Sequence, residues 1–315
     1  MAPSYRSIDY RLRPAKHAER LMLCEAFRHL RFHGMDDYQY VGLGSIYFSD
    51  FRMVHKTLGI SKLFSIEKQE NDSDRFEWNK PFASIQMLFG GTNKRLSDID
   101  FTKPTITWLD YDGPLNSAVI GDIRLIAHSA CHGSVLIVTV NSQPRKDSDQ
   151  GANMLDQIRA ELGEARVPST ADIQSLRGWG LAEFYRGVAG SELLDALSNA
   201  NAVSADGHIC YSQIFNFQYE DGAKMSTFGG VFWKNDRREE FDACNFGRLG
   251  FMRSGDKAFR ITTPKLTIRE INHIERQLPL PHGAVLDLGP IPEKDANEYM
   301  KLYRFLPAFF PVELS

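Results

Sequence analysis

The sequence has few cysteines, and their spacing excludes two classes of small stabilised domain. Its 315 residues include only four, at positions 24, 131, 210 and 244. No two of them form a C-x-x-C pair, and none has a histidine at zinc-finger spacing. A disulfide framework and a zinc module are therefore excluded, and we expect a protein of the reducing cytoplasm.

Long apolar runs and an excess of one charge are also missing. The run Val135–Val140 is far shorter than the roughly 20 residues that cross a bilayer, and residues 1–20 contain no signal-like apolar stretch. We therefore expect a soluble protein without a membrane partner. The 37 basic and 40 acidic residues give a net charge of −3, which does not support a nucleic-acid partner. Hydrophobic residues make up 43% of the chain, which is typical of a globular protein.

Positive charge is concentrated near the N-terminus. Residues 1–33 contain seven basic and three acidic side chains, although the whole chain is slightly acidic. Over Pro14–Phe32 the apolar residues recur at helical spacing, while Lys16, Arg20, Arg28 and Arg31 fall between them. The spacing predicts an amphipathic helix. We interpret the basic residues as a solvated face of this helix; the alternative is a rim that binds an anionic substrate or phosphate.

The middle of the chain alternates short apolar runs with turns and helical stretches, as in a parallel α/β sheet. Strands are predicted at Tyr38–Gly42, Lys62–Glu67, Ser84–Leu88, Thr105–Asp110 and Ser134–Val140, and helices at Phe48–Leu58, Asp72–Asn79, Ser117–His132 and Gly151–Leu162. Parallel strands need crossover connections, which are usually helical. The fold class predicted is therefore a Rossmann-like, doubly wound α/β sheet.

The second half of the chain predicts an antiparallel end to this sheet. Residues 141–205 form an inserted stretch with helical pattern around Leu181–Asn199. The β-type runs His208–Tyr219 and Lys224–Trp233 follow, joined by Glu220-Asp221-Gly222, and Asp-Gly between such runs favours a hairpin. Residues 237–315 are expected to be an extension with a helix over Thr267–Gln277.

A glycine turn and an acidic residue suggest a nucleoside site. Gly42-Leu43-Gly44-Ser45 follows the first strand, where glycines let a ligand approach the backbone. The third glycine of the dinucleotide fingerprint is absent, because Tyr47 stands there. Glu67 ends the second strand, and a carboxylate at that point can accept hydrogen bonds from both ribose hydroxyls. Each feature alone could be structural; together they favour a ligand.

Two carboxylates follow the fourth strand. Asp110 and Asp112 lie where adjacent strands diverge, and they could hold an ammonium group, position a substrate hydroxyl or act as a general base. One of them could instead cap the turn before Gly113. Asn141 could join both as an oxygen ligand of Mg²⁺, but we prefer a site without metal. His128 and His208 are weaker candidates for a base.

These features together resemble a class I S-adenosylmethionine-dependent methyltransferase. The phrases YVGLGSIYFSDF, SIEKQ, RFEWNKPF and WLDYDGPL resemble bacterial proteins described as "putative O-methyltransferases". The resemblance implies that Gly42, Gly44 and Ser45 line the methionine and ribose side, that Glu67 binds the ribose, that Gly90 borders the adenine and that Asp110 lies at the methionine end. The acidic residue that commonly opens the glycine motif is replaced by Tyr40.

The resemblance implies three segments and a function. They are a basic N-terminal helical segment (1–37), a methyltransferase-like domain with an insertion at 141–205 (38–236) and a C-terminal extension (237–315). We predict methyl transfer from S-adenosylmethionine, on oxygen, to an unidentified small-molecule acceptor, with Asp110 and Asp112 as catalytic residues. The alternatives are a non-catalytic nucleoside-binding module, which the Tyr40 substitution favours, and an NAD-linked oxidoreductase.

Overall fold

The computed structural model describes residues 13–144, 153–204 and 207–307. Its strands are β1 (Gln39–Leu43), β2 (Lys62–Glu67), β3 (Ile85–Phe89), β4 (Thr105–Asp110), β5 (Val135–Asn141), β6 (Ile209–Glu220), β7 (Lys224–Lys234) and β8 (Phe259–Ile261). Its α-helices are α1 (Pro14–Phe27), α2 (Ser49–Leu58), α3 (Ser73–Asn79), α4 (Thr92–Arg95), α5 (Ser117–Ser129), α6 (Met154–Leu162), α7 (Gly180–Val203), α8 (Arg238–Ala243), α9 (Ile268–Glu275) and α10 (Glu293–Leu302).

The strands form one eight-stranded sheet in the order β3-β2-β1-β4-β5-β7-β6-β8. Strands β1 to β5 are parallel, and β7 pairs antiparallel with both β5 and β6. The predicted doubly wound sheet with a terminal antiparallel hairpin is therefore confirmed. The short strand β8, which pairs parallel with β6, was not predicted. Its three residues carry too little pattern to be recognised in the sequence.

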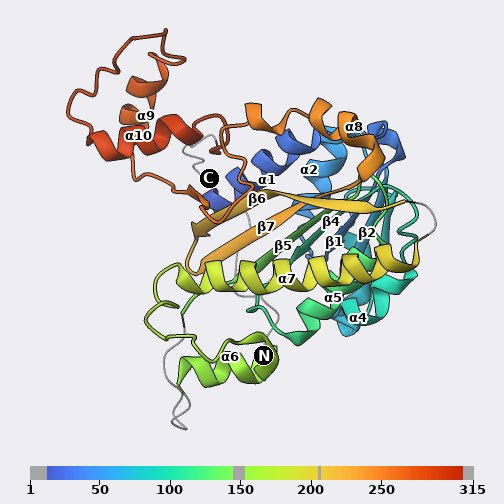
Figure 1. Ribbon diagram of the computed structural model, residues 1–315. Helices are drawn as coiled ribbons and strands as arrows, with labels where there is room; N and C mark the ends of the chain where they lie inside the picture. The colour runs from blue at the N-terminus through green and yellow to red at the C-terminus, as the bar shows by residue number, and fades with distance from the viewer. Residues whose placement is uncertain (1–12, 145–152, 205–206, 308–315) are drawn as a thin grey trace.

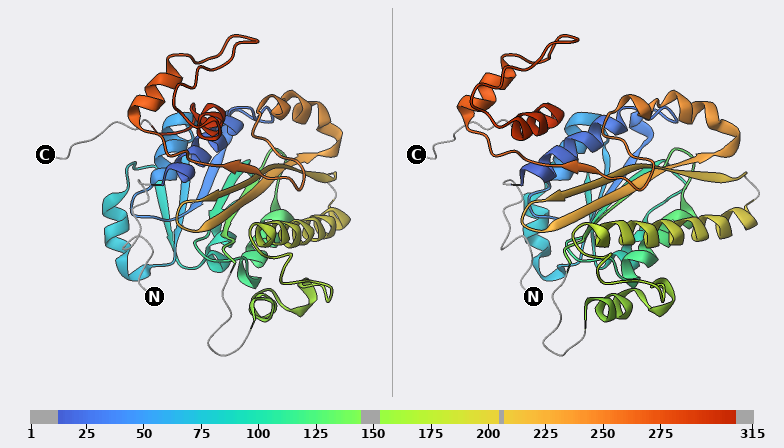
Figure 2. Two further views of the ribbon diagram at one scale, coloured as in Figure 1. Left: turned by 90° about the vertical axis from the view of Figure 1, so that its left-hand side faces the viewer. Right: turned by 60° about the vertical axis from the view of Figure 1, so that its left-hand side comes forward.

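Helices cover both faces of the sheet, so that its central strands are buried on both sides. Figure 1 shows α1, α2 and α8 on one face and α4, α5 and α7 on the other, with α6 beyond α5 and α7. Two apolar cores fill these layers: one joins α1, α2, β6 and the C-terminal helices, and the other joins α5, α6 and α7 to the sheet. Figure 2 shows that α9 and α10 lie on the same side of the sheet as α1.

Local sequence explains several boundaries. Asn116 caps α5 by accepting hydrogen bonds from the N–H groups of Ala118 and Val119, and Gly59 ends α2 in a left-handed conformation. The predicted helix over Pro14–Phe32 is shorter than expected, since α1 ends at Phe27 and turns follow. The short helices α4 and α8, and α10 in the extension, were not predicted.

A glycine pair in β7 lets the hairpin join the parallel part of the sheet closely. A Cβ atom on Gly229 would lie 2.2 Å from the carbonyl oxygen of Leu136 in β5, and one on Gly230 would lie 2.1 Å from that of Ser212 in β6. Any side chain there would force the strands apart.

In the part of the chain that the structure describes, no helix is both long and apolar enough to cross a membrane.

Candidate functional site

The predicted cofactor loops meet at one edge of the sheet. Strands β2, β1 and β4 are adjacent and parallel, with Leu43 opposite Ile66 and Gly42 opposite Trp108. The carboxyl ends of these strands therefore lie side by side. This places Gly44, Glu67 and Asp110, which are far apart in sequence, on a common rim. Their roles in binding remain predictions.

The backbone at Gly44 packs directly against Glu67. The Gly44 N–H donates a hydrogen bond of 2.6 Å to the carbonyl oxygen of Ile66. A Cβ atom on Gly44 would lie 2.8 Å from the Glu67 Cβ and 3.0 Å from its Oε2. Only glycine fits here without a shift of the neighbouring strand. The second glycine of the turn thus lets the Glu67 carboxylate lie against the backbone of the first loop.

Glu67 is held in place by the backbone around it. Its side chain is largely buried, and its Oε1 accepts a hydrogen bond of 2.8 Å from the Gln69 N–H. Burial raises the pKa of Glu67, although the Gln69 N–H works in the opposite direction. The Glu67 carbonyl accepts a 2.9 Å hydrogen bond from the N–H of Gly90, whose φ of 135° favours glycine. The predicted adenine-side glycine therefore adjoins Glu67.

The first glycine of the turn lies over an aromatic pair. Tyr40 is fully buried, and its ring meets that of Phe51 edge to face at 5.3 Å. A Cβ atom on Gly42 would lie 3.0 Å from the Tyr40 hydroxyl oxygen. Burial raises the pKa of Tyr40, so this position is neutral where the class usually carries an acid. Ser45 forms the turn into α2, its carbonyl accepting the Phe48 N–H at 3.0 Å.

Asp110 already has a partner that sequence analysis did not foresee. The Lys16 ammonium, on the first turn of α1, lies 2.7 Å from Asp110 Oδ1 and 2.8 Å from Glu19 Oε2. The Lys16 and Glu19 side chains are 1% and 0% exposed, whereas that of Asp110 is 22% exposed. Asp112, two residues farther on, is exposed. The two predicted catalytic carboxylates thus differ in environment, one tied to a buried cation and one at the surface of the rim.

Glu19 connects this ion pair to a buried chain of hydrogen bonds. Thr227 Oγ1 donates to Glu19 Oε1 and lies 2.8 Å from Thr139 Oγ1, which accepts a 3.0 Å hydrogen bond from Trp108 Nε1. Burial raises the pKa of Glu19, and the ammonium of Lys16 works in the opposite direction. The network fixes α1 to the strands β4, β5 and β7.

A second buried cation on α1 pairs with α2. The Arg20 guanidinium hydrogen-bonds Asp50 in a largely buried pair. Burial opposes the charge of Arg20, but the Asp50 carboxylate outweighs it and raises the Arg20 pKa. The interpretation of Lys16 and Arg20 as part of a solvated face is therefore wrong; only Arg28 and Arg31 are exposed. One signal in the sequence could have indicated this burial: Lys16 and Glu19 have opposite charges at i and i+3, and each follows an alanine.

Another carboxylate that was not predicted links two rim loops. Asp122 on α5 is 2% exposed, and its Oδ2 accepts hydrogen bonds from the hydroxyls of Tyr111, at 2.7 Å, and Thr92. Burial raises the pKa of Asp122. Tyr111 lies between the two predicted catalytic aspartates, and Thr92 follows the adenine-side glycines. Asp122 thus fastens the loop after β4 to the loop after β3.

The two histidine candidates lie away from this rim, whereas Asn141 lies at it, at the end of β5. Helix α5 returns from the carboxyl edge to the start of β5, so His128 near its end lies at the opposite edge, as does His208, which precedes β6. Both therefore lie away from the rim at which the base was expected. Asn141 Oδ1 accepts a 2.9 Å hydrogen bond from the Gln143 N–H and so caps the turn after β5. Among the described residues, no cluster of three His, Cys, Asp or Glu side chains could hold a metal ion.

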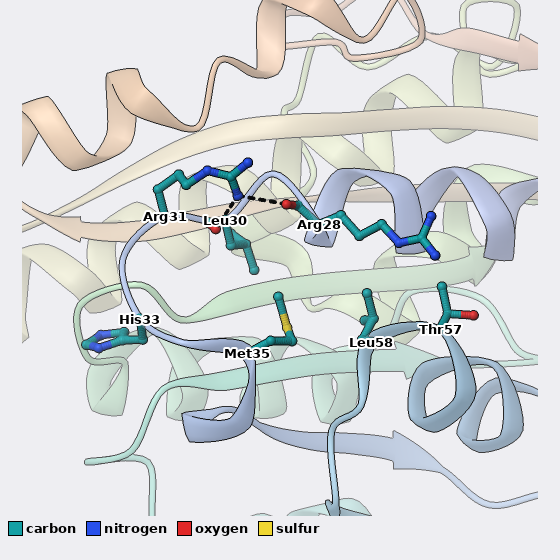
Figure 3. Close-up of a pocket in the computed structure, with 7 residues that line it drawn as sticks. All are labelled: Arg28, Leu30, Arg31, His33, Met35, Thr57 and Leu58. Carbon is teal, nitrogen blue, oxygen red and sulfur yellow. Dashed lines mark hydrogen bonds between the residues drawn. The ribbon is translucent and has the colours of Figure 1, made fainter.

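A pocket of about 280 Å³ lies at the amino edge instead (Figure 3). It is lined by Arg28, Leu30, Arg31, His33, Met35, Thr57 and Leu58. Its basic groups mostly serve the backbone, since Arg31 Nη1 donates to the carbonyls of Arg28 and Leu30, each at 2.8 Å. His33 Nε2 lies 2.9 Å from the His132 carbonyl. The pocket is separate from the rim that carries the predicted residues.

Solved structures share parts of this architecture at low sequence identity. One is Trm1 from Pyrococcus horikoshii with S-adenosyl-L-methionine, with 10% identity and a TM-score of 0.48. The match covers 73% of this chain and 58% of the length of Trm1. A cofactor-bound Rv0187 from MTB gives 14% identity, 72% and 82% coverage of the two chains and a TM-score of 0.36. An S-adenosylmethionine-dependent methyltransferase from Mesorhizobium loti gives 10% identity, covers 66% of this chain and 96% of that chain, and has a TM-score of 0.39. No curated protein matches the sequence.

A protein-family model decides the assignment. The model described as "Putative O-methyltransferase" matches residues 8–314, almost the whole chain. The match includes the rim, α1 and the C-terminal extension. The predicted methyltransferase assignment is thereby confirmed, and the NAD-linked alternative is set aside. This chain belongs to the family of putative O-methyltransferases.

Proposed function

We propose that the protein transfers a methyl group from S-adenosylmethionine to an oxygen atom of a small-molecule acceptor at the rim formed by the loops after β1, β2, β3 and β4. The observation that carries the proposal is the contact between Gly44 and Glu67. A side chain at Gly44 would collide with Glu67, so the first loop is built to leave the carboxylate against bare backbone. That arrangement suits a ribose, whose hydroxyls donate to the carboxylate.

The residues around this contact fit the rest of the cofactor. Gly90 adjoins Glu67 and would border the adenine, while Gly42, Gly44 and Ser45 would face the methionine and ribose side. Asp110 keeps part of its side chain accessible and would hold the ammonium of the methionine moiety. When bound, S-adenosylmethionine supplies an electrophilic methyl group on a sulfonium. The protein then has to align an acceptor oxygen and remove its proton.

Asp112 is the better placed of the two aspartates to act on an acceptor. It is exposed on the rim, whereas Asp110 is committed to Lys16. We therefore assign proton removal or hydroxyl orientation to Asp112 and cofactor binding to Asp110.

We also propose a cytoplasmic location, supported by the four cysteines, all of which are free thiols.

Calorimetric titration and an acceptor screen test this function. The protein should bind S-adenosylmethionine and S-adenosylhomocysteine but not NAD, and Glu67→Ala should abolish binding while the protein stays folded. Incubation with a small-molecule cell extract and isotope-labelled cofactor should give a product heavier by one labelled CH₂ group. Hydrolysis of that product should release labelled methanol if the new bond is a methyl ester. Binding without any labelled product would favour the non-catalytic module.

A further inference from the structure

The ion pair between α1 and the rim joins a buried residue, Lys16, to a partly exposed one, Asp110. The Lys16 ammonium lies 4.5 Å from the centroid of the Trp108 ring and 5.6 Å from that of Tyr219. Both rings and Glu19 surround the ammonium, and its side chain is 1% exposed. Asp110 meets this dry cation through Oδ1, yet 22% of its side chain reaches solvent. Asp110 is thus the link between the interior and the cofactor rim.

The start of α1 is fixed, so the position of Lys16 does not depend on its own ion pairs alone. The Asp221 carboxylate, in the turn between β6 and β7, accepts hydrogen bonds from the backbone N–H groups of Ala15, at 3.4 Å, and Lys16, at 2.9 Å. Negative charge at the start of a helix is favourable. The hairpin therefore places the first turn of α1 over the sheet and delivers the Lys16 side chain to Asp110.

From this geometry we propose that Lys16 is a positioning residue for cofactor binding. Its ammonium holds Oδ1 of Asp110, which keeps the side chain turned so that its accessible part receives the ammonium of the cofactor's amino-acid end. The proposal rests on the proposed function, because it assigns that ammonium to Asp110. Direct binding of the cofactor carboxylate by Lys16 is disfavoured, because the Lys16 ammonium is enclosed by Glu19 and two aromatic rings.

Loss of Lys16 should act on one end of the ligand only. Without the ammonium, Asp110 would face the buried Glu19 with no cation between them, and the repulsion would turn Asp110 away from its present position. A turned Asp110 binds an ammonium poorly, since charge-assisted hydrogen bonds are strong only in the right geometry. The adenine and ribose contacts at Glu67 and Gly90 come from other loops and should be unaffected.

Three ligands separate these effects when titrated against the full chain. S-adenosylhomocysteine carries both the ammonium and the carboxylate, its decarboxylated counterpart keeps only the ammonium, and 5′-methylthioadenosine lacks both. We expect Lys16→Met to weaken the first two about tenfold or more, since a charge-assisted contact is worth at least this factor. Binding of 5′-methylthioadenosine should stay within about twofold. Lys16→Arg should restore most of the loss.

Two further variants keep the test decisive. Lys16→Met/Glu19→Gln removes the buried carboxylate that Lys16→Met leaves without its cation, so it should fold and show the same ligand pattern. Arg20→Met removes the other buried cation of α1, which pairs with Asp50, and should leave the ratio of affinities for the three ligands unchanged.

Several results would overturn the proposal. Weaker binding of S-adenosylhomocysteine alone would mean that Lys16 reads the ligand carboxylate. An equal loss for all three ligands, or no loss, would leave Lys16 a purely structural residue. If the unsubstituted protein bound none of the three ligands, the proposed function would fail, and the role of Lys16 with it.

Discussion

The contact between Gly44 and Glu67 makes a single methyl group a severe test of the rim. In Gly44→Ala the new Cβ would lie 2.8 Å from the Glu67 Cβ, whereas carbon atoms normally pack at about 3.5 Å or more, so the loops must separate by about 0.7 Å. Overpacking of this kind costs about 1–3 kcal/mol. The hydrogen bond from Gly44 to the Ile66 carbonyl restrains the loop and leaves little room for relief. We expect lower stability and at least tenfold weaker binding of S-adenosylhomocysteine.

Urea unfolding and calorimetric titration measure the two effects, and Gly113→Ala is the matched control. Gly113 lies on the same rim after β4, and a Cβ atom there would have no neighbour within 4 Å. This substitution should change the free energy of unfolding by no more than about 1 kcal/mol, in the stabilising direction. Wild-type stability and affinity in Gly44→Ala would refute the close packing on which the proposed ribose site depends.

Three further outcomes follow from the buried carboxylates. Affinity for S-adenosylhomocysteine should rise as the pH increases above about 4.5, because the ribose hydroxyls bind the ionised form of Glu67, whose pKa is raised. In calorimetric titrations of Glu67→Gln, the affinity should no longer depend on pH in this way. Glu19 also has a raised pKa, so the folded state binds its proton more tightly than the unfolded state, and the free energy of unfolding falls as the pH rises above about 4.5. Urea unfolding across pH should therefore show that Glu19→Gln gains stability relative to wild type as the pH rises. A difference that stays constant with pH would contradict this. Asp122→Ala should cost about 1–3 kcal/mol in the same assay, because the hydroxyls of Tyr111 and Thr92 lose their acceptor, whereas Asp122→Asn should cost less.

Regular features of the fold were predictable because their signals are local. The buried strands Lys62–Glu67 and Thr105–Asp110 have the same bounds in the sequence interpretation and in the structure. The Asp-Gly turn likewise marked the terminal hairpin. Parallel pairing then places the ends of β1, β2 and β4 together, so the meeting of Gly44, Glu67 and Asp110 followed from topology. The division at residues 37 and 236 stays a prediction, as do the individual cofactor contacts.

The charged groups beside the rim could not be predicted in the same way. Periodicity separates apolar from polar positions, and it therefore placed Lys16 and Arg20 on a solvated face. Their burial depends on partners more than 25 residues away, Asp110 for one and Asp50 for the other. A buried charge is tolerated only with such a partner, and the partner is known only once the fold is. Asp122 was missed for the same reason.

The neutral Tyr40 gains a different meaning in this setting. A motif comparison treats the loss of an acid at that position as a defect in the glycine turn. In the folded protein, however, the carboxylates of Asp50 on α2 and Asp110 on β4 already place negative charge close enough to act on Tyr40. A further carboxylate at position 40 would lie fully buried beside Phe51, and it would be costly because the nearby cation, Arg20, is already paired with Asp50. The aromatic residue is therefore compatible with a working site, and Tyr40→Glu should destabilise the protein rather than improve cofactor binding.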